Sequence, residues 1–128
     1  MKIVEDPLKT RGNILIALLL LSSPIAYSAE KDINELWCTS MNGDYEFRTK
    51  DGTYIDCLTD EFAVEAEYDY KWKESIGQSL HYAETTNKKA AILFIKRNKS
   101  NKDYLGELNR VISKFDLPIK VFITEESS

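Results

Sequence analysis

The chain has 128 residues, about the length of one ordinary domain. Hydrophobic residues make up 43% of it and charged residues 30%, which excludes a mostly disordered chain and a polytopic membrane protein. The formal net charge of −4 excludes an overall positive field that attracts nucleic acid, and a single histidine, His81, excludes any metal site that needs two.

The first 28 residues have the pattern of a secretory signal peptide. Eight unbroken apolar residues, 14–21, match the length of a signal core and fall far short of the ~20 residues that span a bilayer. Ala26 and Ser28 place small residues at −3 and −1, so we expect cleavage after Ser28; an uncleaved N-terminal anchor is the alternative. We therefore expect a periplasmic or secreted bacterial protein with no stable membrane insertion after signal removal. Cleavage would remove three basic and two acidic residues and change the net charge from −4 to −5.

Export bears on the two cysteines of the chain, Cys38 and Cys57. An oxidising compartment permits a disulfide, and we expect these two thiols to pair. A helix over residues 33–41 that lies beside the second predicted strand would bring them within bridging distance. Two buried free thiols are the alternative.

Residues 29–128 show no internal repeat and no low-complexity linker, and we expect them to form one domain. Asp32 can cap the first helix, Asn42-Gly43 can end it, and the Asp51-Gly52 pair indicates a hairpin turn. The expected elements are a helix at 33–41, strands at 44–49, 53–58 and 62–68, a helix at 71–86, a strand at 90–95, a helix at 102–115 and a strand at 119–124.

These elements predict the fold class. Short connections make the first three strands an antiparallel meander, whereas helical crossovers make the last two strands parallel with right-handed connections. The continuous apolar run at 90–95 is typical of a strand buried on both faces. We therefore expect an α/β fold of mixed α+β character, with a mixed five-stranded sheet flanked by helices in the order α-β-β-β-α-β-α-β.

Acidic residues concentrate on the second and third predicted strands. Asp56 lies on the second, and Glu65 and Glu67 share one face of the third. Because neighbouring strands lie about 4.8 Å apart, Asp56 and Glu65 can converge on one cation, with Glu67 as a further ligand. Carboxylates that leave positions for water and phosphate suit Mg²⁺ or Mn²⁺, which polarises a phosphoryl oxygen and activates water. The alternative is that these acids line the solvated face of the meander.

An acid on a second strand, an acid-x-acid element on a third, and then a helix with a Gln resemble the PD-(D/E)XK nuclease superfamily and its restriction-endonuclease-like fold. Residues 78–82 (QSLHY) resemble the Gln-x-x-x-Tyr motif of its recombination-exonuclease branch, and residues 37–95 resemble small uncharacterised exported bacterial members. The resemblance implies a metal-dependent nuclease that hydrolyses DNA. The residues that it implicates in catalysis or substrate binding are Asp56, Glu65, Gln78 and Tyr82.

The sequence departs from that family at Glu67, where the family has a lysine that stabilises developing negative charge. Lys71, at the start of the following helix, can replace this lysine in catalysis by reaching back to the acids; an ordinary helix-start lysine is the alternative. Gln78 lies seven positions further on, about two helical turns, and so shares the face of Lys71. If neither Lys71 nor Glu67 repairs the site, we expect an inactive domain of the same fold that acts as an interaction module for an unknown protein partner.

A basic tract surrounds the fourth predicted strand of this otherwise acidic chain. Its six positive charges, Lys96 and Arg97 foremost, could hold a phosphate backbone near the metal site, so DNA is the expected partner. Solvated loop ends are the alternative. The members of the tract are Lys88, Lys89, Lys96, Arg97, Lys99 and Lys102.

Overall fold

A computed structural model describes residues 29–126 of the chain. The chain divides into two units, Met1–Lys31 and Asp32–Ser128. Helix α2 (Ala29–Ser40) begins in the first unit, of which the structure describes residues 29–31. The expected signal peptide and its cleavage after Ser28 lie outside the described residues.

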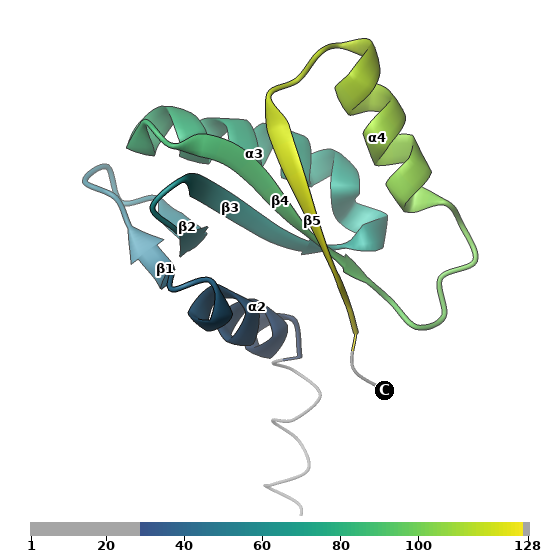
Figure 1. The fold of residues 1–128 in the computed structure, drawn as a ribbon, viewed down its shortest axis with the longest axis horizontal. Helices are drawn as coiled ribbons and strands as arrows, with labels where there is room; N and C mark the ends of the chain where they lie inside the picture. The colour runs from purple at the N-terminus through teal and green to yellow at the C-terminus, as the bar shows by residue number, and fades with distance from the viewer. Residues whose placement is uncertain (1–28, 127–128) are drawn as a thin grey trace, which may run out of the picture. The chain divides into compact units, whose positions relative to one another are not determined.

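The second unit contains the predicted elements in the predicted order (Figure 1). The largest difference in a boundary is at α2, which begins at Ala29 rather than at residue 33, because Ala, Glu and Lys favour a helix. None of the described helices is long and apolar enough to cross a membrane. The elements that follow α2 are β1 (Asp44–Arg48), β2 (Tyr54–Leu58), β3 (Phe62–Tyr68), the 3₁₀ turn η2 (Asp69–Lys71), α3 (Trp72–Thr86), β4 (Lys89–Lys96), α4 (Tyr104–Lys114) and β5 (Ile119–Glu125).

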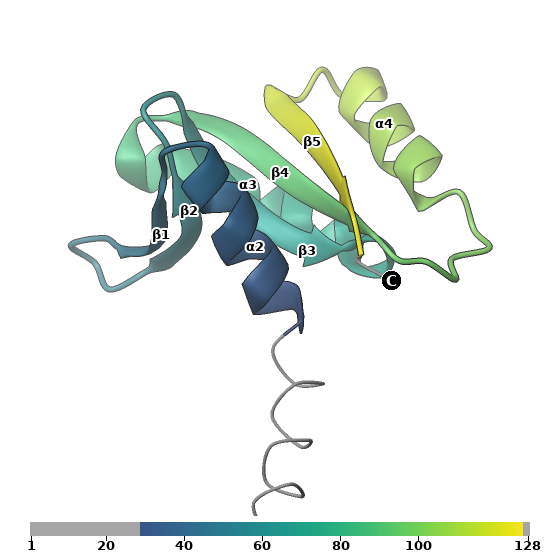
Figure 2. The ribbon, with the colours of Figure 1, turned by 60° about the horizontal axis from the view of Figure 1, so that its bottom comes forward.

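The strands form one five-stranded mixed sheet in the order β1-β2-β3-β4-β5. β1, β2 and β3 pair antiparallel, and β4 pairs parallel with both β3 and β5, which confirms the predicted meander and crossovers. Helix α2 covers one face of the sheet, and α3 and α4 cover the other (Figures 1 and 2). The α/β architecture is therefore confirmed, while the restriction-endonuclease-like core within it stays a prediction.

Strand β4 forms the centre of the core, as its apolar sequence predicts, because six of its eight residues are buried. Leu93 and Ile95 belong to the cluster that contains Cys38 of α2. Ile92 and Phe94 point the other way, into a cluster with residues of α3 and α4. Both faces of the sheet are therefore sealed around β4, and the polar groups of the site lie toward β2 and β3.

The predicted disulfide between Cys38 and Cys57 is present and ties α2 to β2, with 5.7 Å between the two Cα atoms. It packs against the turn that follows α2. A Cβ added at Gly43 would lie 2.6 Å from Cys57 Sγ and 2.8 Å from Cys38 Sγ, so a glycine is required for this close approach. A second tie comes from buried Asn34, whose Nδ2 donates a hydrogen bond to the backbone oxygen of Asp56 at 3.1 Å.

Candidate functional site

The carboxyl groups of Asp56 and Glu65 come together on the face of the sheet that α3 covers. β2 and β3 pair through Cys57 and Val64, so Asp56 and Glu65 are the next pair of facing residues. Asp56 extends the contact between the strands with its side chain, because Oδ2 accepts a hydrogen bond from the backbone N–H of Ala66 at 2.8 Å. The two acids thus arise from the register of one antiparallel hairpin.

Glu65 and Glu67 are buried, with 2% and 9% of their surfaces exposed. Helix α3 lies over them and turns its buried polar residues, among them Ser75 and Tyr82, toward the sheet. The alternative in which these acids line a solvated face of the meander is therefore wrong for Glu65 and Glu67. That expectation came from the alternating pattern of β3, which indicates a polar face. The pattern cannot show that a helix from later in the chain covers this face.

Burial raises the pKa of both acids. Burial raises the pKa of Glu65 well above its ordinary value, repulsion by Asp56 raises it further, and the hydroxyl of Tyr82 lowers it in part. Burial also raises the pKa of Asp56, although hydrogen bonds with Glu65 and with the N–H of Ala66 lower it; the charge of nearby Glu46 raises it again. The pair therefore holds a proton at neutral pH.

One oxygen of this pair lacks a partner. Oε2 of Glu65 is buried without a hydrogen bond among the described residues, and so is Oγ of Ser75. A carboxylate oxygen of this kind is a suitable donor to a cation. Mg²⁺ needs one or two carboxylates and takes its other ligands from water and phosphate, so the donor set of Asp56 and Glu65 fits such an ion.

Glu67 is not part of a three-ligand cluster. Within residues 29–126, no group of three or more His, Cys, Asp or Glu side chains lies close enough to hold a metal ion. The Oε1 atom of Glu67 accepts a hydrogen bond from the backbone N–H of Tyr68 at 3.2 Å. The structure therefore brings the carboxyl groups of Asp56 and Glu65 together with the charge of Glu67 nearby, and metal binding by these residues stays a prediction.

Gln78 and Tyr82 share one face of α3, as their spacing predicts. The Tyr82 hydroxyl donates a hydrogen bond to Gln78 Oε1 at 3.3 Å. Tyr82 is 7% exposed, and burial together with the charges of Glu65 and Asp56 raises its pKa. Gln78 is exposed. Tyr82 therefore lies behind the acid pair and connects it to a surface amide, rather than offering its own ring to a substrate.

Lys71 precedes α3 and ends η2. Its Nζ lies 5.8 Å from the centroid of the Tyr70 ring. This aromatic contact places the ammonium at the C-terminal end of β3. The expected reach of Lys71 to Asp56 and Glu65 stays a prediction.

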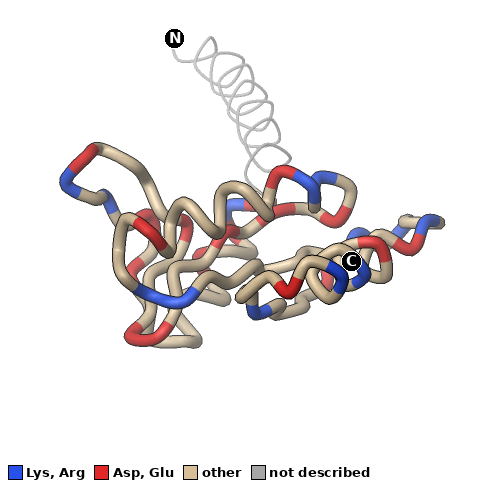
Figure 3. The backbone as a smooth tube through the Cα atoms, turned by 90° about the horizontal axis from the view of Figure 1, so that it is seen from above, with Lys and Arg blue, Asp and Glu red and all other residues tan. Residues whose placement is uncertain are grey.

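The basic tract is divided between the two ends of β4. The eight residues of β4 span about 23 Å at 3.3 Å per residue, so the tract cannot act as one cluster. At the first end, Lys88 Nζ donates to the backbone oxygen of Asp60 at 2.7 Å, and Lys89 forms an ion pair with Glu61 at 3.1 Å. Figure 3 shows basic and acidic positions interspersed along the described chain. The expectation of six positive charges beside the acids is therefore wrong; the four that include Arg97 lie at the other end of β4.

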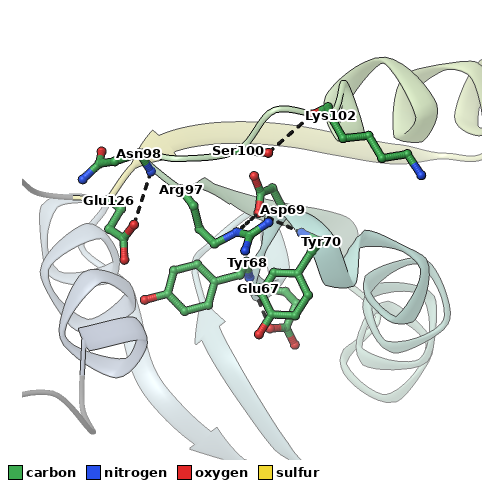
Figure 4. A network of polar contacts seen from close by, with 9 residues as sticks. All are labelled: Glu67, Tyr68, Asp69, Tyr70, Arg97, Asn98, Ser100, Lys102 and Glu126. Atoms are coloured by element: carbon green, nitrogen blue, oxygen red, sulfur yellow. Dashed lines mark hydrogen bonds and ion pairs between the residues drawn. The ribbon is translucent and has the colours of Figure 1, made fainter.

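A buried acid that the sequence analysis missed follows directly after β3. Asp69 is 1% exposed and accepts hydrogen bonds from Arg97 Nε at 2.6 Å and from the backbone N–H of Tyr70 at 2.8 Å (Figure 4). Burial by itself raises the pKa of Asp69, but hydrogen bonds from Arg97 and Ser100 and the charge of Arg97 lower it overall. Arg97, expected at a substrate, is thus engaged with Asp69 through Nε.

A signal for this contact exists in the sequence. β3 and β4 are parallel and pair Tyr68 with Ile95, so the residues that follow the two strands meet at one end of the sheet. Continuing that register brings residues 69–70 beside 96–97. An acid after one predicted parallel strand and an arginine after the next therefore indicate an ion pair.

No family model matches the chain, and no solved structure matches it. One curated protein, the KilA-N domain-containing protein L33 of Acanthamoeba polyphaga mimivirus, is 35% identical to it over 109 residues. The match includes 80% of this chain but 42% of the viral protein, so the chain spans less than half the length of this relative.

This similarity corrects the expectation drawn from the sequence motifs. The relative is named for a KilA-N domain, which is a different family from the PD-(D/E)XK nucleases. The description of the chain as a PD-(D/E)XK member is therefore wrong. The assignment failed because the motifs behind the resemblance are short: one or two acids and an amide at close spacings. An ordinary hairpin followed by a helix also contains residues of these types at these spacings.

Proposed function

We propose that this domain binds a divalent cation at Asp56 and Glu65 and hydrolyses phosphodiester bonds of DNA. One observation carries the proposal: two carboxyl groups from adjacent strands meet in a buried position, and Oε2 of Glu65 has no hydrogen-bond partner. A bound Mg²⁺ or Mn²⁺ would supply polarisation of a phosphoryl oxygen and activation of water. The other roles belong to residues of this chain.

The electrostatics of the pair support cation binding. Burial raises the pKa of both acids, and repulsion by Asp56 raises the pKa of Glu65 further, so the pair keeps a proton that a cation must displace. Cation binding should therefore release protons and become stronger as the pH rises. This arrangement does not help to stabilise the fold, because two facing buried acids without a base lower the stability of the folded state.

Helix α3 supplies the remaining groups. Tyr82 holds its hydroxyl between the acids and Gln78, which orients the exposed amide of Gln78 beside the pair. That amide can position a water molecule or a phosphate oxygen. Lys71, at the start of the same helix, supplies the positive charge that Glu67 cannot supply.

The position of Glu67 favours a second function. Glu67 is a buried acid, and a catalytic site would need a positively charged side chain at this position to stabilise the charge of a phosphate. In this second proposal the domain keeps its fold, does not hydrolyse DNA and binds a protein partner. Both proposals place the protein outside the cytoplasm, in the periplasm or secreted, and the Cys38–Cys57 disulfide supports an oxidising compartment.

Titration calorimetry with Mn²⁺ and a plasmid-nicking assay on the full chain test the first proposal. We expect the wild type to bind Mn²⁺ and nick DNA, and Asp56→Asn and Glu65→Gln to lose both properties. Glu61→Gln is the matched control, because Glu61 is an exposed glutamate of the same β2–β3 hairpin and pairs with Lys89. This control should bind and nick as the wild type does.

Three outcomes separate the proposals. Binding of Mn²⁺ without nicking rejects hydrolysis and selects the interaction module. Absence of Mn²⁺ binding by the wild type rejects the cation site itself. If nicking occurs, Lys71→Ala should reduce it about 10²–10³-fold while Mn²⁺ affinity is kept; equal nicking would show that Lys71 has no part in catalysis.

A further inference from the structure

We infer that the C-terminal end of β3 carries a binding site for single-stranded nucleic acid, formed by Tyr68, Tyr70 and Arg97, and we name these three residues the tyrosine platform. The inference goes beyond the proposed function, because it adds a surface for nucleic acid and states the form of nucleic acid that this surface takes. The proposed hydrolysis leaves open whether the substrate is a duplex or a single strand.

The rings of the tyrosine platform are arranged for stacking. Tyr68 and Tyr70 lie nearly parallel, with 6.3 Å between ring centroids and 18° between ring planes. The guanidinium carbon of Arg97 lies 4.4 Å from the centroid of Tyr70, and Lys71 Nζ lies 5.8 Å from the same centroid. Tyr70 is nevertheless 45% exposed. The surface therefore presents a partly exposed aromatic ring with two cations close to it, and Figure 4 shows Arg97 beside the two tyrosines.

Asp69 fixes the tyrosine platform before any ligand arrives. It is 1% exposed, and it accepts hydrogen bonds from Arg97 Nε and from the backbone N–H of Tyr70 (Figure 4). One buried acid thus orients both the ring and the guanidinium. Because this contact uses Nε, the two Nη groups of Arg97 can still donate to an anion such as a phosphate. A preorganised site of this kind loses little conformational entropy on binding.

The chemistry of the tyrosine platform fits a base next to a phosphate. Aromatic rings bind nucleobases by stacking, which requires an unstacked base, while Arg and Lys bind the phosphates. Two exposed lysines, Lys96 and Lys99, extend the positive charge along the loop that follows β4. A duplex hides the faces of its bases and offers phosphates alone. The combination therefore favours a single strand over a duplex.

The tyrosine platform lies apart from the acid pair. Tyr68 follows Glu65 by three residues of the same extended strand, so the two side chains point to opposite faces of the sheet. Tyr68 packs against the cluster that contains Cys38, whereas helix α3 covers Glu65. The tyrosine platform is therefore a binding surface separate from the acid pair.

The molecule contains a matched control. Tyr54 on β2 is 57% exposed and carries Arg48 over its ring, with 5.7 Å from the guanidinium carbon to the centroid. Tyr54 and Tyr70 are therefore both exposed tyrosines beside an arginine. Arg48 has no counterpart of the buried Asp69 contact among the ion pairs of the described residues.

Fluorescence anisotropy of the full chain with a fluorescein-labelled DNA single strand of about 12 nucleotides, in EDTA, tests the inference. We expect the single strand to bind at least about tenfold more tightly than the duplex of the same sequence. Tyr70→Ala should weaken single-strand binding by about 5- to 150-fold, the range for loss of one stacked base. Tyr70→Trp should keep the affinity, and Tyr54→Ala should leave it unchanged.

The inference fails if Tyr70→Ala binds as the wild type does, if both tyrosine variants lose affinity equally, or if the duplex binds as tightly as the single strand. Circular dichroism checks that each variant is folded. Should Tyr70→Ala unfold, Lys96→Glu with Lys99→Glu provides a second test, which must weaken binding and flatten its salt dependence. The two proposals are tested separately, because binding is measured in EDTA and nicking is measured with Mn²⁺. Single-strand binding in EDTA by a wild type that does not nick DNA with Mn²⁺ rejects hydrolysis alone. Nicking with Mn²⁺ together with equal single-strand binding by the wild type and Tyr70→Ala rejects the tyrosine platform alone.

Discussion

Glu65 lies within β3 and Asp69 follows the end of that strand four residues later; the two acids are almost equally buried, yet their pKa values shift in opposite directions. The pKa of Glu65 is raised by burial and by Asp56, whereas hydrogen bonds and the charge of Arg97 outweigh burial and lower the pKa of Asp69. Exposure is 2% for Glu65 and 1% for Asp69. The charge of a buried acid here is therefore decided by its partner, and burial alone does not predict it.

The comparison also separates stability from function. Asp69 has the base and the N–H that a buried carboxylate needs, so its contacts stabilise the fold and position Arg97. Glu65 faces another acid and keeps an oxygen without a partner. An arrangement that costs stability without a structural return is typical of a binding or catalytic site. Four changes test whether the two acids differ in this way.

The largest effect is expected from Arg97→Ala, which removes the partner of Asp69. It leaves the buried carboxylate of Asp69 without its base, so the free energy of unfolding should fall in urea denaturation. Lys89→Ala breaks the exposed pair with Glu61 and should cost less than about 1 kcal/mol. Equal losses in the two variants would show that Asp69 is no more dependent on its partner than a surface acid is.

Reduction of the Cys38–Cys57 disulfide should act on the Glu65 side of the comparison. The bond closes a loop with a sequence separation of 19 and contributes about 3 kcal/mol to the free energy of unfolding in the chain-entropy model. It holds β2, which carries Asp56, and does not touch the β3–β4 contact of Asp69. Thermal unfolding with and without reductant measures the loss. Cation binding should weaken with it, and an unchanged melting temperature would contradict the prediction.

Glu65→Gln should flatten the pH dependence of stability. An acid whose pKa is raised on folding stabilises the protein fully below its unfolded pKa, near 4.5, and this stabilisation is lost as the pH rises toward the folded pKa. The wild type should therefore lose up to about 1.4 kcal/mol per pH unit above that value from this group. Urea denaturation across pH 5–9 should show a flatter profile for Glu65→Gln. Parallel profiles would mean that Glu65 is ionised in the fold.

The smallest effect is expected from Tyr82→Phe. The hydroxyl of Tyr82 lowers the pKa of Glu65 in part and donates to Gln78. Its removal should cost about 1 kcal/mol of unfolding free energy and shift the loss of stability described above to higher pH. The control is Tyr45→Phe: burial raises the pKa of Tyr45 to about 12, and this tyrosine lies on β1. An identical shift of the pH profile in both variants would show that Tyr82 has no specific effect on the pKa of Glu65.

The bounds of β3, the strand that contains Glu65, were predicted as the structure has them. The residues of this strand alternate between two faces, and a turn precedes it in the sequence. The sequence did not predict that α3 covers that strand, since the polar face of α3 reads as a solvated face until its partner is known. The Asp69–Arg97 pair was missed because its members are 28 residues apart and meet only through the parallel register of β3 and β4. The basic tract was predicted as one cluster because its members are close in sequence. An extended strand of eight residues, β4, separates them into two groups.

Gly43 gives the disulfide an evolutionary consequence. A side chain at this position would occupy the space of the two sulfur atoms, with its Cβ 2.6 Å and 2.8 Å away. The choice of residue at 43 is therefore tied to the presence of both cysteines rather than to the turn alone. Loss of either cysteine would remove one of these sulfur contacts, while the backbone oxygen of Leu58, 3.2 Å from the added Cβ, would still restrict the position. A substitution at 43 should therefore be tolerated better in a chain without the disulfide than in one that keeps it.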